Sequence, residues 1–167
     1  MQEHAIEGSN QYLTFTLDNG VYALDIASVR EVLEMTAITR VPRTPEFMRG
    51  VINLRGHGVP VVDMRRKFGL PVVEQTVDTC IIILEVHQEG EATLLGALVD
   101  SVREVLELPA SELLPPPRMG VVDAEFLRGM GKLGEEFVLI LDPDRVFSLT
   151  ELLGLQKGSQ AQDEAAA

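Results

Sequence analysis

The feature that most constrains this chain is a seven-residue segment that occurs twice. SVREVLE stands at residues 28–34 and again at 101–107, 73 positions later. A second matching pair follows the two copies, EFMRG at 46–50 and EFLRG at 125–129, now 79 positions apart. Self-similarity at a fixed spacing is the signature of a duplicated structural unit. The sequence therefore predicts two related modules of roughly 70 residues each, the second slightly longer than the first.

Each module begins with a pattern of short strands. Apolar side chains alternate with threonines over residues 12–17, and alternation returns over 22–26, as in half-buried strands. Asn19-Gly20 lies between them and is expected to supply the positive φ angles of a tight hairpin. The second module opens in the same way, with a β-branched run at 80–86 and a return strand at 93–99. Both modules therefore start with a β-hairpin.

The rest of each module is predicted to form one helical turn and three more strands. SVREVLE fits a helical turn that leads into a strand. Residues 50–63 and 129–142 then each predict a strand, a glycine-rich turn and a second strand that ends on an aspartate before a helix. The last helix has the features of a real N-terminus, with Asp142 as the cap, Pro143 at the first position and a stripe formed by Val146, Leu149 and Leu153.

About five short strands in so few residues predict a small closed barrel, because closure removes exposed sheet edges. We expect a mainly all-β fold of two tandem five-stranded barrels, with short helices and a C-terminal helix. The expected boundaries are 11–72 for the first barrel and 77–153 for the second, with flexible ends at 1–10 and 156–167. Two such barrels packed together would leave a groove between them, a common place for a ligand.

Charge and composition exclude several classes of protein. The chain has 14 Lys+Arg against 26 Asp+Glu and a net charge of −12, the wrong sign for binding nucleic acid. A single cysteine, Cys80, allows no intrachain disulfide. The apolar runs are far shorter than a membrane span, and the N-terminus lacks the pattern of a signal peptide. These features predict a soluble, cytoplasmic protein.

The residues that carry enzyme chemistry are scattered. His4, His57 and His87 stand in three separate segments without metal-ligand spacing, and Cys80 opens an apolar strand, where a cysteine is usually a small buried hydrophobe. We expect no catalytic residue, metal or cofactor. Residues 129–134 match the dinucleotide pattern G-x-G-x-x-G, but a β run follows them instead of a helix, so these glycines are expected at barrel corners.

Two further segments receive structural interpretations. One segment is predicted to be the solvent-exposed face of a short helix and contains the charged residues Asp63, Arg65, Arg66 and Lys67. The negative charge of the aspartate is favourable at the helix N-terminus because of the helix dipole. The three prolines at 115–117 predict a stiff, extended loop. That loop is either packed across the joint between the modules or presented to a partner.

Taken together, these segments resemble the CheW family of chemotaxis coupling proteins. The resemblance is carried by QYLTFTLDNGVYALDIASVREVLEM and TPEFMRGVINLRGHGVPVVDMRRKFG in the first half, and by LGALVDSVREVLELPASELLPPP and FLRGMGKLGEEFVLILDPDRVF in the second. It covers about residues 11–153, and Asn53-Leu54-Arg55-Gly56 before V-P-V-V-D is specific to the family.

The resemblance implies a fold and an activity. The fold is two SH3-like five-stranded barrels, and the activity is non-catalytic: an adaptor that couples the cytoplasmic tips of chemoreceptors to the regulatory domain of the histidine kinase CheA in membrane-associated arrays, and that is a monomer by itself. By position, the receptor-binding surface falls on Val29, Glu31, Gly50 and Arg55. Gly134 stands in the second module where the first has Arg55, so this donor is unique to one module.

The kinase-binding surface implied by the resemblance lies in the second module, on Pro117, Met119 and Val122. Other functions stay open at this point. One is a CheW-like paralogue in another chemosensory pathway, such as pilus motility. Another is a small-ligand binder or enzyme that uses the groove between the barrels, which would need a pocket gathering His57 with Asp63 or Glu31. An excised regulatory domain of a kinase is disfavoured, because the chain starts at Met and ends in a polar tail.

Overall fold

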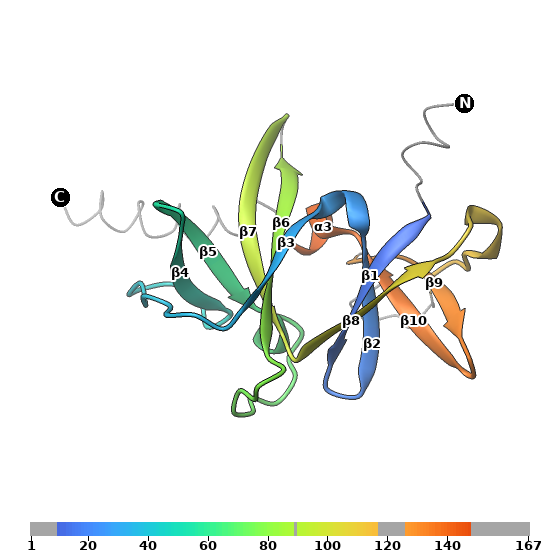
Figure 1. Ribbon diagram of the computed structural model, residues 1–167, viewed down its shortest axis with the longest axis horizontal. Coiled ribbons are helices and arrows are strands. Elements are labelled where there is room, and N and C mark those ends of the chain that lie inside the picture. Colours follow the sequence, from blue (N-terminus) through green and yellow to red (C-terminus); the bar gives the residue numbers. More distant parts are fainter. Residues whose placement is uncertain (1–9, 89, 117–125, 148–167) are drawn as a thin grey trace, which may run out of the picture.

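The computed structural model describes residues 10–88, 90–116 and 126–147, which form a mainly β fold with a few short helical turns (Figure 1). The strands are β1 (Gln11–Leu17), β2 (Gly20–Asp25), β3 (Val29–Glu34), β4 (Met48–Leu54), β5 (His57–Asp63), β6 (Cys80–Gln88), β7 (Glu91–Val99), β8 (Ser101–Glu107), β9 (Leu127–Leu133) and β10 (Glu136–Leu141). The helical turns are η1 (Ile26–Ser28), α2 (Met64–Lys67), η2 (Ala110–Glu112) and α3 (Pro143–Val146). The prediction of a mainly β fold is confirmed.

The ten strands form two five-stranded sheets, as predicted, but the sheets do not follow the order of the chain. One sheet has the order β8-β1-β2-β10-β9 and the other β3-β6-β7-β5-β4. The β1–β2 hairpin, blue in Figure 1, therefore lies between strands from the second half of the chain. The β6–β7 hairpin lies in the same way between strands from the first half.

The sheets therefore differ from the tandem division expected at 11–72 and 77–153. Each sheet takes the hairpin of one repeat and the last three strands of the other. The chain crosses between the sheets after its second strand in each repeat, through η1 in the first and Asp100 in the second. Hydrophobic periodicity shows that a hairpin buries its apolar face, but it does not show which repeat supplies the neighbouring strands.

The two copies of SVREVLE have the same role in the two sheets. They form the edge strands β3 and β8, and each contains a β-bulge near its arginine. In β3 the extra residue is Arg30, and in β8 residues Arg103 and Glu104 lie opposite a single residue of β1. The predicted helical turn is present only before β3, as η1. A bulge on an edge strand bends it and re-aims its side chains, which explains why the same seven residues serve both edges.

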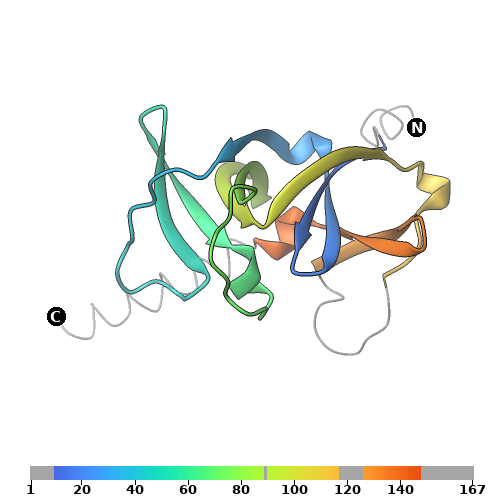
Figure 2. The same cartoon turned by 60° about the horizontal axis from the view of Figure 1, so that its bottom comes forward.

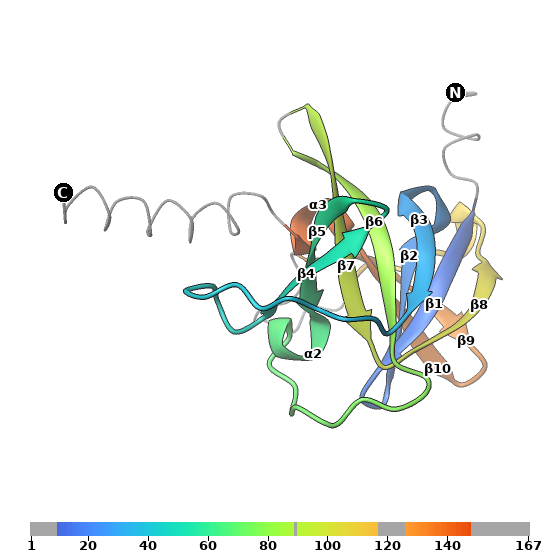
Figure 3. The same cartoon turned by 60° about the vertical axis from the view of Figure 1, so that its left-hand side comes forward.

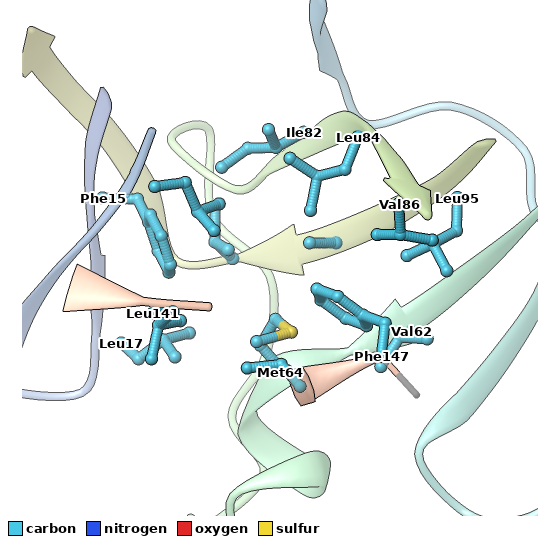
Figure 4. Close-up of a cluster of buried hydrophobic side chains, with 14 of the residues drawn as sticks. Phe15, Leu17, Val62, Met64, Ile82, Leu84, Val86, Leu95, Leu141 and Phe147 are labelled. Atoms are coloured by element: carbon cyan, nitrogen blue, oxygen red, sulfur yellow. The ribbon is translucent and has the colours of Figure 1, made fainter. Parts of the chain in front are cut away.

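A large apolar cluster fills the joint between the sheets (Figure 4). Alternation along β6 shows why: Ile81 and Ile83 face the interior of their own barrel, while Ile82 and Leu84 face the joint. Strand β6 is thus buried on both faces, which accounts for its β-branched run. We call this set the joint cluster; its buried members are Leu13, Phe15, Leu17, Leu24, Val62, Met64, Ile82, Leu84, Val86, Leu95, Ala97, Val99, Leu127, Leu141, Val146 and Phe147.

The short helices are capped as the sequence predicts. The Asp63 carboxylate accepts hydrogen bonds from the backbone N–H groups of Arg65 (3.0 Å) and Arg66 (3.3 Å) at the start of α2. At the start of α3, Asp142 accepts from the N–H of Asp144 (3.1 Å), with Pro143 in the first turn. Val146 is buried in the joint cluster, while Leu149 and Leu153 lie outside the described residues.

The first hairpin turn differs from the expectation. Leu17 pairs with Gly20, so the turn residues are Asp18 and Asn19 rather than Asn19 and Gly20. The positive φ of 58° belongs to Asp18. The N–H of Asp18 donates to the Asp100 carboxylate over 2.7 Å, and this long-range contact is invisible to a local turn rule.

Arg65 contradicts the interpretation of α2 as a solvated face. Its side chain is only 11% exposed and makes a bidentate contact with Asp100, from Nε to Oδ1 (2.8 Å) and from Nη2 to Oδ2 (2.7 Å). It also donates to the carbonyl of Pro71 (2.6 Å) and lies 3.4 Å from the Asp18 carboxylate. Arg65 therefore ties α2 to the crossover at Asp100 and to the β1–β2 hairpin of the other sheet, which is blue in Figure 2.

Candidate functional site

The four residues of the expected receptor-binding surface all lie in the β3–β6–β7–β5–β4 sheet. Val29 and Glu31 are on β3, Gly50 is on β4, and Arg55 is in the turn between β4 and β5. Strands β3 and β4 are the two edges of this sheet, so a contact between them requires the sheet to curl into a barrel. The structure brings Glu31 and Arg55 together across these edges and leaves Val29 and Gly50 elsewhere.

Arg55 is displayed by a tight two-residue turn. Leu54 pairs with His57, which leaves Arg55 and Gly56 as the turn, with φ values of 51° and 90°. Both positive angles are those of a type I′ hairpin turn, which suits the twist of the strands but is unfavourable for a side chain such as arginine. The Asn53 side chain accepts a hydrogen bond from the N–H of Gly56 (2.7 Å) and holds the turn. The result is an arginine side chain that is 70% exposed.

Glu31 holds the guanidinium group of Arg55. Nη2 of Arg55 donates to Oε2 of Glu31, and the two groups also form an ion pair. The hydrogen bond from Arg55 lowers the pKa of the Glu31 carboxyl, which keeps it ionised as the acceptor. Because the bulge at Arg30 shifts the alternation of β3, it sets the side of the strand on which Glu31 emerges.

The second repeat provides an internal comparison. Glu104 is the counterpart of Glu31 in the identical heptapeptide, and Gly134 is the counterpart of Arg55 in the β9–β10 turn. Among the residues that the structure describes, Glu104 forms no ion pair. Among the described residues, an ion pair of this kind is therefore present on one barrel and not at the corresponding position of the other. A binding site that belongs to one barrel should show this difference.

Gly50 has a structural role in this fold. It is buried with φ of 147°, and a Cβ atom there would lie 2.2 Å from the carbonyl oxygen of Thr39. The neighbouring residue Val51 exchanges two backbone hydrogen bonds with Thr39, each 2.8 Å long. Gly129 repeats this arrangement beneath Leu114, with a Cβ-to-oxygen distance of 2.7 Å. The backbone at Thr39 therefore approaches Gly50 too closely for any side chain at this position.

Val29 lies at the start of β3, where it is partly buried and packs against the joint cluster. Its counterpart Val102 packs against the same cluster from β8. The two valines therefore have the same packing role in the two copies of the heptapeptide.

The Glu31–Arg55 pair borders an open hollow of about 350 Å³. Its lining comes from β3, β6, β7 and the β4–β5 turn and comprises Arg30, Glu31, Leu54, Arg55, Ile83, Glu85, Ala92, Thr93 and Leu94. A second ion pair, Arg30 with Glu85, lies in the same hollow, and His87 is 3.3 Å from Glu85. Sequence reasoning missed Glu85. The only signal was a single acidic residue within the apolar run of β6.

A larger hollow of about 890 Å³ lies around the connection between β3 and β4, the cyan segment in Figure 3. Arg40, Arg43, Arg49 and Arg66 line it, together with the exposed side chains of Val41, Val72 and Val73. Arg49 precedes Gly50 near one end of β4, and Arg55 follows the other end. The two hollows are therefore separate faces of one barrel.

A groove-based catalytic centre would bring His57 together with Asp63 or Glu31, but His57 is apart from Asp63 and is not in the lining of the hollow that contains Glu31. His57 and Asp63 are the two ends of β5, and Asp63 is buried as the cap of α2. Side chains of the joint cluster occupy the space between the two sheets. Within residues 10–88, 90–116 and 126–147, no group of three or more His, Cys, Asp or Glu is placed to hold a metal ion. In the same ranges, no helix has the length and apolar character needed to cross a bilayer.

The expected kinase-binding residues Pro117, Met119 and Val122 lie outside the described residues. Their segment belongs to the connection between β8 and β9. The counterpart of this connection in the first repeat is the one between β3 and β4, which lines the larger hollow.

The two interleaved five-stranded sheets define a double SH3-like barrel protein, and one of the two barrels carries the Glu31–Arg55 ion pair. A family model described as the CheW-like domain matches residues 11–151. The chain belongs to the CheW family. It is 38% identical over 143 residues to chemotaxis protein CheW of Klebsiella aerogenes, covering 85% of this chain and 84% of that one. It is 31% identical to protein FrzA of Myxococcus xanthus, covering 62% of each chain.

A solved structure supports the same assignment. The scaffolding protein CheW from Thermoanaerobacter tengcongensis superposes with a TM-score of 0.74 at 34% identity, covering 83% of this chain and 92% of that one. The resemblance stated from the sequence is thereby confirmed, and so is the fold it implied.

Proposed function

We propose that this protein is a non-catalytic scaffold of a chemotaxis array, and that it couples the cytoplasmic tips of chemoreceptors to the histidine kinase CheA. Family membership supports the role, since relatives carry the names chemotaxis protein CheW and scaffolding protein CheW. The observation that carries the proposal is the Glu31–Arg55 pair, displayed on one barrel only. A coupler of this kind works in the cytoplasm and reaches the membrane through its receptor partner.

The receptor-binding face is proposed at Arg55 and Glu31. The receptor tip in this family is a helical hairpin, and a helix binds most readily when its apolar ridge enters a groove and a few polar contacts fix its register. Arg55 offers a planar fork of donors to carboxylate or carbonyl oxygens, and Glu31 fixes the orientation of that fork before binding. Val29 and Gly50 stay proposed receptor contacts from the family resemblance, although Val29 also packs against the joint cluster and Gly50 lies close to Thr39.

The kinase is proposed to bind elsewhere, because a coupler must hold both partners at once. Pro117, Met119 and Val122 stay the proposed contacts on one barrel. The larger hollow around the β3–β4 connection is the corresponding position on the other barrel. Its exposed valines and arginine rim suit an apolar protein surface with acidic neighbours.

A second candidate function is a coupler in a different chemosensory pathway. The similarity to protein FrzA favours it as a specific alternative. Binding to a panel of receptor tips would separate the two, because both functions use the same Arg55 face and differ only in the receptor.

We expect Arg55→Asp to weaken binding of a purified receptor cytoplasmic fragment at least tenfold, because it replaces the displayed donor with an acid beside Glu31. Binding to the CheA regulatory domain and the midpoint of thermal unfolding are expected to stay unchanged, since Arg55 is 70% exposed. Isothermal titration with each partner measures both affinities.

Lys132→Asp is the matched control. It makes the same change of charge at an exposed position on the corresponding hairpin of the other barrel, and receptor binding is expected to stay within twofold of the parent protein. Unchanged receptor affinity in Arg55→Asp would overturn the proposed receptor-binding face.

A further inference from the structure

The hollow beside Arg55 contains two ion pairs with the same orientation. Arg55 pairs with Glu31, and Arg30 pairs with Glu85. The arginine side chains are 70% and 56% exposed, while the glutamate side chains are 29% and 18% exposed. Both glutamates therefore lie beneath the guanidinium groups they hold. A partner approaching this face meets two oriented donor groups rather than two neutral pairs.

The floor between these groups is apolar. Leu54 and Ile83 are buried, and Leu94 on β7 is 38% exposed beside them. The hollow, at about 350 Å³, is near the lower end of the range for ligand sites, and it is open to the surface. It has room for one or two apolar side chains from the ridge of a helix, with polar neighbours of that ridge reaching the arginines.

The other barrel lacks this arrangement although it has the same heptapeptide. Arg103 corresponds to Arg30, and the position that corresponds to Glu85 is Thr16, whose hydroxyl hydrogen-bonds Ser101 over 2.7 Å. Among the described residues Arg103 forms no ion pair. The second arginine anchor, like the first, is thus built on one barrel only.

We propose that Arg30, held by Glu85, acts with Arg55 as a two-arginine clamp, and that Leu94 forms the apolar floor between them. The clamp fits a receptor-tip helix that carries acidic side chains on both sides of an apolar residue. This rests on the proposed function and adds Arg30, Glu85 and Leu94 to the receptor-binding face as residues that determine which helix is bound.

The test is a titration of a receptor cytoplasmic fragment with the full chain carrying Arg30→Glu or Arg103→Glu. The two variants make the same change within the same seven-residue sequence. We expect Arg30→Glu to weaken binding at least tenfold and to reduce the loss of affinity between 50 and 500 mM NaCl, because one screened charge contact is gone. Arg103→Glu is expected to stay within twofold of the parent protein.

Two further variants examine the parts of the clamp. Glu85→Gln keeps the charge of Arg30 but removes the carboxylate that pairs with it, and we expect the affinity for the receptor fragment to fall at least threefold. Leu94→Ser is expected to weaken binding at least fivefold at every salt concentration, since the lost contact is apolar. All variants are compared by thermal unfolding, so that a loss of binding caused by misfolding is recognised.

The outcomes separate this inference from the function on which it rests. Loss of binding in Arg55→Asp with full binding in Arg30→Glu would overturn the clamp and leave the adaptor function in place. Full binding in both variants would overturn the receptor-binding face itself. Equal losses in Arg30→Glu and Arg103→Glu would indicate a general charge effect and would also overturn the clamp.

Discussion

Phe15→Ala is expected to destabilise the whole molecule by about 3–5 kcal/mol, the usual cost of removing a buried phenylalanine. Phe15 is 0% exposed, stacks on Tyr22 with ring centroids 5.9 Å apart, and lies in the joint cluster (Figure 4). That cluster draws side chains from both sheets, so the lost contacts stabilise both barrels at once. Chemical denaturation followed by circular dichroism should show one transition, displaced to lower denaturant.

The interleaved strands give the reason for a single transition. Strand β1 pairs with β2 and β8, which belong to different repeats, so neither repeat contains a complete sheet. Phe137→Ala is the control, because Phe137 is 49% exposed on β10 and its truncation is expected to cost no more than about 0.5 kcal/mol. Two separate transitions, with only one moved by Phe15→Ala, would contradict the shared core.

Arg65→Ala is expected to cost about 2–4 kcal/mol, somewhat less than breaking a fully buried ion pair because Asp100 keeps partial contact with water. The substitution removes the bidentate contact with Asp100 and the bond to the Pro71 carbonyl, and it leaves the Asp100 carboxylate without its cationic partner. Equilibrium unfolding in urea at neutral pH measures the loss.

Arg66→Ala is the matched control from the same helical turn. Its contacts with Glu46 and Asp63 are longer, at 3.6 Å and 3.8 Å, and its own side chain is 35% exposed, so a loss of at most about 1 kcal/mol is expected. Comparable losses for the two arginines would show that Arg65 is no more than a surface residue.

The same contact gives a pH dependence of known sign. Partial burial alone would raise the pKa of Asp100, but the hydrogen bonds from Arg65 and from the Asp18 N–H outweigh it and lower the pKa. The contribution to stability is therefore present above the unfolded-state pKa of about 4 and is lost as the pH falls through the lower folded-state value. The difference in unfolding free energy between the parent protein and Asp100→Asn should shrink between pH 5 and pH 3. A constant difference would contradict the assignment.

Much of the local structure follows from the sequence because it depends on neighbouring residues. The alternation over 12–17 predicts β1, and the aspartates at 63 and 142 predict the caps of α2 and α3. Arg55 was identified through the family motif, and its asymmetry with Gly134 was already visible in the repeat. Glu85 and Arg30 were missed because their pairing joins two strands that are about 55 residues apart and depends on the register between β3 and β6.

The sequence by itself determined that the chain contains two copies of one β unit, which segments form strands, and which family it belongs to. These properties depend on periodicity, capping and motif spacing, all of which are local along the chain. The tertiary structure decided that the copies exchange hairpins, that Gly50 is covered by Thr39, and that Arg65 is part of a partly buried contact. Those properties depend on which strands and side chains come together in space. The alternation of apolar residues along each strand is compatible with several different pairings of the strands, so it does not select one of them.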